Sequence, residues 1–310
     1  MKSVKILGRT NLRPRQIERL AAICDLEVFE SNVLNRSIDE VIRRADNAEI
    51  ALINAFTPID RRAVGSLPAL RAVVSCSAGI DHVDLSACGE AGIRVFWFPG
   101  YSARTLAEKT LAFILMGLNR ILPAVQSVRT GEWDYLAFQG REAPRRVVAV
   151  LGYGATGRIV RELCESLGFL VETVNSRTPS DDIRRILKQA DIVTLHLSLN
   201  QKTERYLRKE TLRMLKDDVI IVNTARGGLI HDRDLVDFLR GHPQATAFLD
   251  VLATEPMPTN SDYRDVSNAV VTPHIGWNSV ESDARLADQT MQKLIDLIEQ
   301  PVPASRGTAK

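Results

Sequence analysis

Three short runs in the last third of the chain contain side chains that could reduce a ketone. The runs are Asn223 to Gly228, Asp250 to Pro256 and Thr272 to Gly276, and they carry Arg226, Glu255 and His274 in that order. A guanidinium offers a planar fork that can grip a carboxylate and a neighbouring carbonyl oxygen together. An imidazole exchanges protons near neutral pH, and a nearby carboxylate favours its charged form. These residue types predict a ketone-reducing site that still needs a source of hydride.

A glycine-rich turn in the middle of the chain predicts that source. An apolar run at 147–151 is followed by a turn and then by a helical pattern. The turn consists of Gly152, Tyr153, Gly154, Ala155, Thr156 and Gly157. Its first glycine permits a tight turn, its second lets backbone approach a pyrophosphate, and its third allows close helix packing. The helix N-terminus adds free N–H donors. Because strand, turn and helix occur together, we interpret the turn as a dinucleotide site rather than a structural glycine turn.

The strand expected next, at 170–174, indicates which dinucleotide is bound. Enzymes that use NAD commonly have an acid at the end of this strand, where it binds the ribose hydroxyls. Here the strand is followed by Asn175, Ser176 and Arg177, and an arginine suits a 2′-phosphate. We therefore predict a preference for NADP, with NAD as a possible cofactor. The alternative is that Arg177 is an ordinary solvated arginine.

Each member of the trio also has an ordinary structural interpretation. Arg226 could be a surface ion-pair partner, Glu255 could cap a turn before Pro256, and His274 could be a hydrogen-bonded core histidine. As an ordered set behind a dinucleotide turn, the three favour the catalytic interpretation. We expect no metal site.

The elements that must position these residues alternate between apolar runs and helical patterns, which predicts an α/β fold with parallel sheets. Strands are expected at 4–7, 48–53, 70–75 and 93–96, and then at 146–151, 170–174, 192–195, 219–222, 247–250 and 269–272. The second series predicts a doubly wound (Rossmann) sheet. Pro99 and Gly100 precede a long apolar helix and indicate a domain crossing, and an amphipathic helix is expected at 282–299.

The bulk composition limits the classes of function. The chain has 310 residues, a hydrophobic content of 45% and a formal net charge of +2. The length favours about two domains, and the scattered charges favour neither a nucleic-acid nor a membrane partner. Cysteines at 24, 76, 88 and 164 lack the spacing of a disulfide scaffold or a CxxC motif. Because the start of the chain predicts a strand rather than a signal peptide, we expect a cytoplasmic protein.

Further motifs extend the pattern along nearly the whole chain. They are Ser77 to Leu85, Pro99 to Ser102, Leu106 to Glu108 and Ala190 to Leu197. With the glycine turn and the trio, they resemble the D-isomer-specific 2-hydroxyacid dehydrogenase family. The resemblance implies a smaller, flavodoxin-like substrate domain, residues 1–98 plus 279–310, into which a Rossmann dinucleotide domain, residues 99–278, is inserted. It also implies catalysis in the cleft between them and a homodimer formed through the nucleotide domains.

The resemblance assigns roles to individual residues. Arg226 is expected to bind the substrate carboxylate and carbonyl, and His274, paired with Glu255, to protonate the carbonyl oxygen as hydride arrives. The amides of Ala78 and Gly79 are expected to cradle the substrate carboxylate. The remaining cofactor residues that the resemblance implies are Thr224, Ala225 and Asp250, of which Asp250 is expected to hold the nicotinamide carboxamide.

The substrate is less defined by the sequence. Glu255 argues against formate dehydrogenase, in which this acid is replaced because no proton transfer accompanies hydride transfer. Reduction of glyoxylate or hydroxypyruvate fits NADPH use, whereas Trp97, Tyr101 and Trp277 could shape a pocket for an aromatic keto acid or simply pack. Two alternatives stay open: an enzyme like 3-phosphoglycerate dehydrogenase, and a binding protein like the dinucleotide-sensing corepressors of the same family.

Overall fold

The computed structural model describes residues 1–29 and 37–300 of the chain. The chain divides into two compact units, Met1–Tyr101 with Ser279–Lys310, and Ser102–Asn278. The divisions therefore follow Tyr101 and Asn278, whereas we expected them after residues 98 and 278.

The first unit is built on a five-stranded parallel sheet with the strand order β2-β1-β3-β4-β5. Its strands are β1 (Ser3–Ile6), β2 (Asp25–Val28), β3 (Ile50–Asn54), β4 (Ala72–Cys76) and β5 (Arg94–Phe96). This is the flavodoxin-like order that was predicted. β2 was not among the expected strands; its four residues include two acids and are nowhere fully buried.

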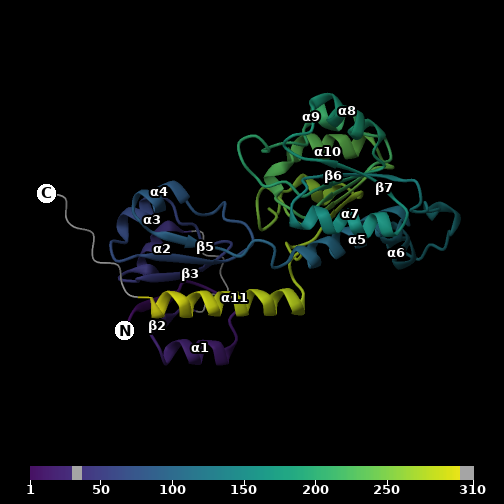
Figure 1. Cartoon of the computed structure of the whole chain (residues 1–310). Helices are drawn as coiled ribbons and strands as arrows, with labels where there is room; N and C mark the ends of the chain where they lie inside the picture. Colours follow the sequence, from purple (N-terminus) through teal and green to yellow (C-terminus); the bar gives the residue numbers. More distant parts are fainter. Residues whose placement is uncertain (30–36, 301–310) are drawn as a thin grey trace. The chain divides into compact units, whose positions relative to one another are not determined.

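Helices cover both faces of this sheet (Figure 1). They are α1 (Pro14–Ala21) and α11 (Val280–Glu299) on one face, and α2 (Ile38–Ala45), α3 (Arg61–Ser66) and α4 (Leu85–Glu90) on the other. Ser37, Asp60 and Asp84 cap α2, α3 and α4 by accepting a backbone N–H three residues later. Buried residues of these three helices form one core with Ile53 and Val73 of the central strands.

The second unit contains a six-stranded parallel sheet with the order β11-β10-β9-β8-β6-β7. Its strands are β6 (Val147–Leu151), β7 (Leu170–Val174), β8 (Ile192–Leu195), β9 (Ile220–Asn223), β10 (Thr246–Leu249) and β11 (Ala269–Val271). All six predicted strands are present, each within two residues of its predicted bounds. The strand order reverses between β6 and β8, and ligands of such sheets bind beyond the carboxyl ends of the strands at this point.

Helices cover both faces of the second sheet as well (Figure 1). They are α5 (Ala103–Leu118) and α7 (Ala155–Ser166) on one face, and α8 (Ser180–Gln189), α9 (Lys209–Leu212) and α10 (Asp232–Gly241) on the other. Each face has its own apolar core. The remaining elements are α6 (Ile121–Arg129), η1 (Leu136–Phe138), η2 (Gly227–Leu229) and η3 (Asp262–Asp265).

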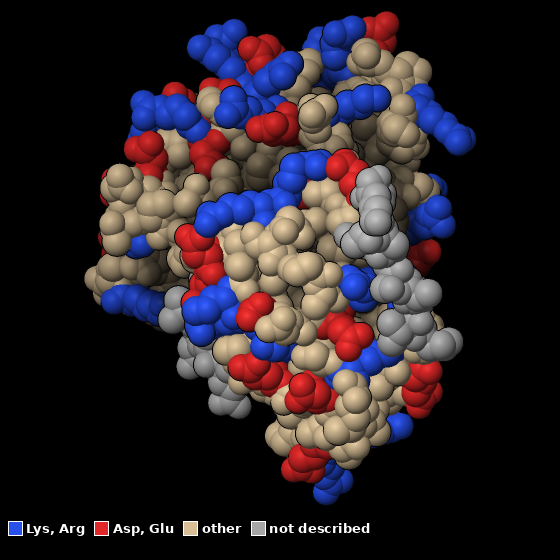
Figure 2. Space-filling model, turned by 90° about the vertical axis from the view of Figure 1, so that its left-hand side faces the viewer, with Lys and Arg blue, Asp and Glu red and all other residues tan. Residues whose placement is uncertain are grey.

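Two surface properties bear on the expected partners. Basic and acidic side chains lie interspersed on the face drawn in Figure 2. Among residues 1–29 and 37–300, no single helix is both long and apolar enough to cross a membrane, and α5 and α6 pass that test only when joined across a bend of 63°.

Candidate active site

The glycine turn joins β6 to α7 with the close backbone approaches that its sequence predicted. Gly152 has a φ of +103°, and a Cβ on it would overlap the backbone of His196, which follows β8. A Cβ on Gly157 would overlap the carbonyl oxygen of Gly152. A Cβ on Gly154, in contrast, would meet nothing within 4 Å. The turn is therefore closed on the protein side and open at the second glycine, which suits the approach of a phosphate group to the first turn of α7.

Tyr153 and two arginines of α7 form a small basic group beside this turn. The Tyr153 ring lies under the guanidinium carbons of Arg158, at 5.6 Å, and Arg161, at 5.9 Å. Arg161 is also paired with Glu165 at 2.7 Å. Alanine and threonine at 155 and 156 are the first two residues of α7, so their backbone N–H groups belong to its unbonded first turn.

The three predicted residues after β7 form a tight polar turn. The Asn175 side chain accepts the N–H of Arg177 at 2.9 Å, and the Asn175 N–H donates to Thr178 Oγ1 at 3.0 Å. Asn175, Ser176 and Arg177 are all exposed. Within the described part of the chain, the Arg177 guanidinium has no acidic partner, so its charge is available at the surface.

Asn223, the last residue of β9, shapes the segment that carries Arg226. Its side chain is fully buried, donates to the Arg226 carbonyl at 2.9 Å and accepts the Ala225 N–H at 3.1 Å. The adjacent Thr224 is also buried, and its hydroxyl lies 3.0 Å from that of Thr110 in α5. Asn223 was expected only as the first residue of the Arg226 motif, without a role of its own. A polar residue at the end of an otherwise apolar strand is the signal that could have identified it.

Gly227 brings the Arg226 segment against the segment that carries Glu255. A Cβ on Gly227 would overlap the backbone of Leu252 and Ala253. The N–H of Leu252 donates to Glu255 Oε1 at 3.0 Å, so the same backbone that contacts Gly227 also fixes the carboxylate. Only glycine allows two loops to approach this closely.

Glu255 and His274 are in direct contact. Glu255 Oε2 lies 2.8 Å from His274 Nδ1, and the two side chains are 20% and 27% exposed. Because Oε1 is held by Leu252 and Oε2 by the imidazole, the carboxylate fixes the plane of the ring and places a proton on Nδ1. Proton exchange with another group then falls to Nε2.

The backbone at His274 has a left-handed conformation, with a φ of +54°. Such a conformation is unfavourable for a residue with a side chain, and it persists only where the surroundings hold it. Here the His274 N–H donates to the Asp250 and Thr272 carbonyls, both at 2.9 Å.

The carboxylate of Asp250 holds the rest of this loop. It is buried, and it accepts the Thr272 hydroxyl at 2.6 Å, the Ile275 N–H at 2.9 Å and the Gly276 N–H at 2.6 Å. The role expected for Asp250 was a contact with the nicotinamide carboxamide. The structure gives it a second task, since it sets the path of the chain on both sides of His274.

Ala78 and Gly79 lie in the first unit, in the loop that follows β4. Both are half-buried. Within the described residues, the N–H groups of Ala78, Gly79 and Ile80 donate to no acceptor in the chain. Successive unbonded amides of this kind suit an anionic ligand.

Comparison with known proteins identifies the family. Residues 111–276, which lie within the second unit, match the model described as D-isomer specific 2-hydroxyacid dehydrogenase, NAD binding domain. The chain belongs to this family. It is a 2-hydroxyacid dehydrogenase of two-domain α/β architecture, and its cofactor is a nicotinamide dinucleotide. No group of three or more His, Cys, Asp or Glu within residues 1–29 and 37–300 is placed to hold a metal ion.

Individual relatives cover most of the chain. A glycerate dehydrogenase of Methylorubrum extorquens is 32% identical over 273 residues, 84% of this chain and 85% of the relative. A glyoxylate reductase of Thermofilum pendens is 29% identical and covers 93% of this chain and 89% of its own length. The crystal structure of a Thermus thermophilus protein superposes with a TM-score of 0.86 at 30% identity, over 97% of this chain and 99% of that one.

Proposed function

We propose that this dehydrogenase reduces a small 2-keto acid to the D-2-hydroxy acid, with Arg226, Glu255 and His274 as its catalytic residues. The observation that supports this most directly is the 2.8 Å contact between Glu255 and His274. It supplies a histidine whose ring is oriented by a carboxylate on Nδ1, which leaves Nε2 to act as the general acid for ketone reduction. Gly227 and Asn223 hold the Arg226 segment beside the same backbone.

The proposed reaction divides substrate binding and proton donation between Arg226 and His274. The Arg226 guanidinium binds the substrate carboxylate and polarises its carbonyl oxygen. When bound, the dinucleotide supplies the hydride. As negative charge develops on the carbonyl oxygen, His274 Nε2 donates its proton, and the carboxylate of Glu255 stabilises the imidazolium beforehand. The amides of Ala78 and Gly79, in the proposed substrate domain, bind the carboxylate as well.

We infer a substrate of the glyoxylate or hydroxypyruvate type. Support comes from relatives named glyoxylate reductase, glycerate dehydrogenase and hydroxypyruvate reductase at 29–32% identity. The alternative resembling 3-phosphoglycerate dehydrogenase is supported by a relative from Methanocaldococcus jannaschii that is 29% identical, although the chain spans only 54% of its length.

The test follows NADPH absorbance with a panel of 2-keto acids, including glyoxylate and hydroxypyruvate. His274→Ala should abolish most turnover, because it removes the acid, and a His274→Ala activity within a few fold of wild type would contradict its role. His242→Ala is a matched control, since His242 contacts the Phe238 carbonyl and Asp217 at the end of α10. Tight NADPH binding with no turnover of any keto acid would instead favour the corepressor-type binding protein.

We propose that NADPH is preferred over NADH. The exposed Arg177 and the uncharged Asn175 at the end of β7 support this preference, because neither repels a 2′-phosphate. Asn175→Asp combined with Arg177→Ala should raise the KM for NADPH far more than that for NADH. Arg184→Ala, which removes another exposed arginine from the neighbouring α8, should leave both values unchanged. Equal effects of the double substitution on the two cofactors would exclude the proposal.

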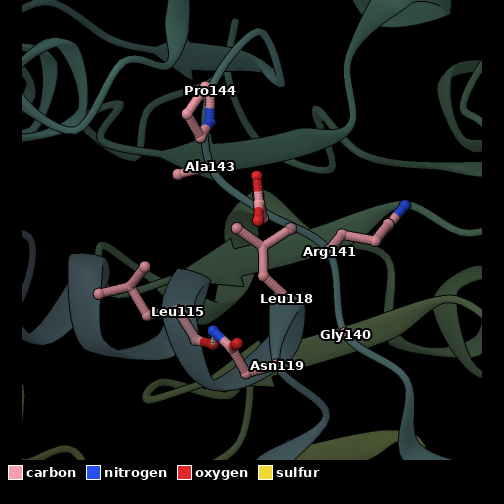
Figure 3. A pocket seen from close by; sticks show the side chains of 8 residues that line it. Leu115, Leu118, Asn119, Gly140, Arg141, Ala143 and Pro144 are labelled. Atoms are coloured by element: carbon pink, nitrogen blue, oxygen red, sulfur yellow. Dashed lines mark hydrogen bonds between the residues drawn. The ribbon is translucent and has the colours of Figure 1, made fainter.

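We further propose a homodimer formed through the second unit. Exposed apolar side chains occur along α6 and the following segment, with Trp133 at 84%, Tyr135 at 80% and Leu136 at 75% exposure. The same segment leads into an open hollow of about 640 Å³. Figure 3 shows Leu115 and Leu118 of α5 on one side of it and Ala143 and Pro144 on the other. Exposed apolar side chains that are followed along the chain by an open hollow suit a two-fold interface, in which each copy offers both.

Light scattering on the purified chain tests the dimer. Trp133→Glu should convert the dimer to a monomer, whereas Leu167→Glu, at another exposed apolar position of the same unit, should not. A monomeric wild-type protein at micromolar concentration would refute the dimer.

We also propose that the protein is cytoplasmic. Its four free cysteines support this location, because disulfides are rare in the reducing cytoplasm. Cell fractionation tests this proposal.

A further inference from the structure

A hydrogen-bonded series of polar side chains, here called the relay, supports the Ala78–Gly79 loop of the first unit and consists of His82, Ser75 and Ser77. Ser75 Oγ is 3.0 Å from His82 Nε2 and 2.7 Å from Ser77 Oγ, and Ser77 Oγ donates to the Gly79 carbonyl at 2.6 Å. Ser75 is fully buried and Ser77 nearly so. We propose that His82 and Ser75, acting through Ser77, are positioning residues that fix the Gly79–Ile80 peptide and so align the run of amides at Ala78, Gly79 and Ile80 for the substrate carboxylate. This inference rests on the proposed function of that loop.

The number of available protons allows only one direction of donation along this series of side chains. The single hydroxyl proton of Ser77 is donated to the Gly79 carbonyl, so Ser77 Oγ must accept from Ser75. The proton of Ser75 is then used on Ser77, so Ser75 Oγ must accept from His82. His82 therefore carries a proton on Nε2. The order of donation runs from the imidazole through both hydroxyls to the Gly79 carbonyl, and removing any one member leaves the next without its partner.

The carbonyl at the end of this chain controls the direction of an amide. A peptide unit is planar and trans, so the Gly79 carbonyl and the Ile80 N–H point in opposite directions. Tying the carbonyl to Ser77 turns the Ile80 N–H away from the protein side. Glycine has the widest choice of backbone conformations, and a loop with Gly79 at its centre needs such a restraint to keep its amides aligned before the ligand arrives.

The ends of the loop are fixed independently of these side chains. The Phe98 N–H donates to the Ser77 carbonyl at 2.9 Å, and the Ile59 N–H donates to the His82 carbonyl at 2.9 Å. The relay of His82, Ser75 and Ser77 therefore restrains the middle of the loop, not its attachment to the unit.

A purely structural role would not require this arrangement. A buried hydroxyl needs a partner, but replacing both members of a buried pair with apolar groups of similar shape is close to neutral for stability. β4 is otherwise apolar except for its final cysteine, and an alanine or valine at 75 would pack without any polar partner. The functional role of the relay follows from its last acceptor, because the Gly79 carbonyl belongs to the backbone of the proposed binding loop.

The experiment measures steady-state kinetics on the full chain, with glyoxylate as the probe keto acid. Ser75→Ala and His82→Leu should each raise the KM for glyoxylate about 10- to 100-fold, which corresponds to weakening one charge-assisted hydrogen bond. The turnover number should change much less, because the lost contact is made in both the ground state and the transition state. The Kd for NADPH, measured by fluorescence, should stay within twofold, since the matched cofactor domain lies in the other unit.

A conservative substitution separates positioning from folding. His82→Gln retains an N–H donor toward Ser75 and should restore the KM for glyoxylate to within about threefold of wild type, whereas His82→Leu should not. Should Ser75→Ala fail to fold, the His82 pair carries the same test. Equal KM values for His82→Leu and His82→Gln, or a Ser75→Ala variant with the wild-type KM, would overturn the inference. A wild-type protein that reduces no 2-keto acid would refute the proposed function instead, which keeps the two failures distinct.

Discussion

Substitution of Gly227 by alanine tests whether the close approach of two loops assembles the proposed catalytic trio of Arg226, Glu255 and His274. The added Cβ would lie far inside 3.0 Å of the Leu252 carbonyl group and the Ala253 nitrogen, closer than real Cβ atoms come to any atom. Backbone cannot rotate away as a side chain can, so the two loops must separate by more than about 1 Å. A misplacement of about this size can reduce catalysis about 100-fold. We therefore expect kcat/KM to fall by about 100-fold or more.

The stability change should be smaller than the change in activity. Overpacking of a dense interior typically costs about 1–3 kcal/mol, which for a unit of this size lowers the melting temperature by roughly 2–12 °C. Gly227→Ala should therefore remain folded at 25 °C while losing activity. Circular dichroism and thermal denaturation, run beside the NADPH assay, separate the two effects.

The neighbouring glycine provides the control. A Cβ on Gly228 would meet only the end of the Leu199 side chain, at 3.0 Å, and this side chain can move. Gly228→Ala should retain kcat/KM within about threefold. The reasoning is refuted if Gly227→Ala keeps near wild-type activity, or if Gly228→Ala loses as much as Gly227→Ala does.

Three further predictions concern groups around the site. Burial lowers the pKa of His196 to about 4, so between pH 7.5 and pH 5 the unfolded chain binds a proton at this residue and the folded chain does not. The free energy of unfolding should therefore fall by about 2 kcal/mol over this range, and urea titrations should show a weaker pH dependence for His196→Gln. Asp250→Asn replaces an acceptor of three hydrogen bonds with an amide whose NH2 group repels one of the donors. It should lower the free energy of unfolding by about 2 kcal/mol and remove most of the activity, whereas Thr272→Val, which removes one of the three bonds, should lower it by about 1 kcal/mol in thermal denaturation. Burial raises the pKa of Cys164 to about 12 and that of Cys76 to about 11. A thiol reagent should therefore react slowly with the native protein and rapidly with all four thiols after unfolding, and a fast reaction in the native state would contradict this burial.

The sequence alone predicted the two parallel sheets because six of their inner strands are buried along nearly their whole length and are therefore almost continuously apolar. They are β3, β4, β6, β8, β9 and β10. The strand that was not predicted is β2, which has the alternating exposed and half-buried pattern of an edge strand. Its acids at 25 and 27 interrupt the apolar signal, and only pairing with β1 shows that the segment is a strand. The edge strands β5, β7 and β11 are also only partly buried, but they keep enough apolar residues to be predicted. A short edge strand with an acid at every second position, such as β2, gives no such signal.

The pairing of Glu255 with His274 was also expected from the sequence, since the resemblance matched both positions. The sequence could not give the hydrogen-bond partners that hold these residues, because those partners are set by the path of each loop. Asp250 is an example: its motif suggested a contact with the cofactor, while its buried carboxylate also accepts three donors from the loop of His274. A residue type and a motif position do not reveal which local donors a carboxylate meets.

One construction recurs at the strand ends that carry the chemistry. Asn223 at the end of β9, Asp250 directly after β10, and Ser75 with Ser77 at the end of β4 are all buried polar residues. Asn223 and the two serines hold the loops that follow their own strands, which carry Arg226 and the amides of Ala78 and Gly79. Asp250 holds the neighbouring loop after β11, which carries His274. Functional loops are usually mobile, whereas these are tied to strands that are rigid because they are packed on both faces. The polar residue is tolerated in the interior only because the loop backbone satisfies it, so a substitution there disturbs the loop before it disturbs the sheet. A loss of activity larger than the loss of stability can explain is therefore the behaviour that distinguishes these positions from the apolar core around them.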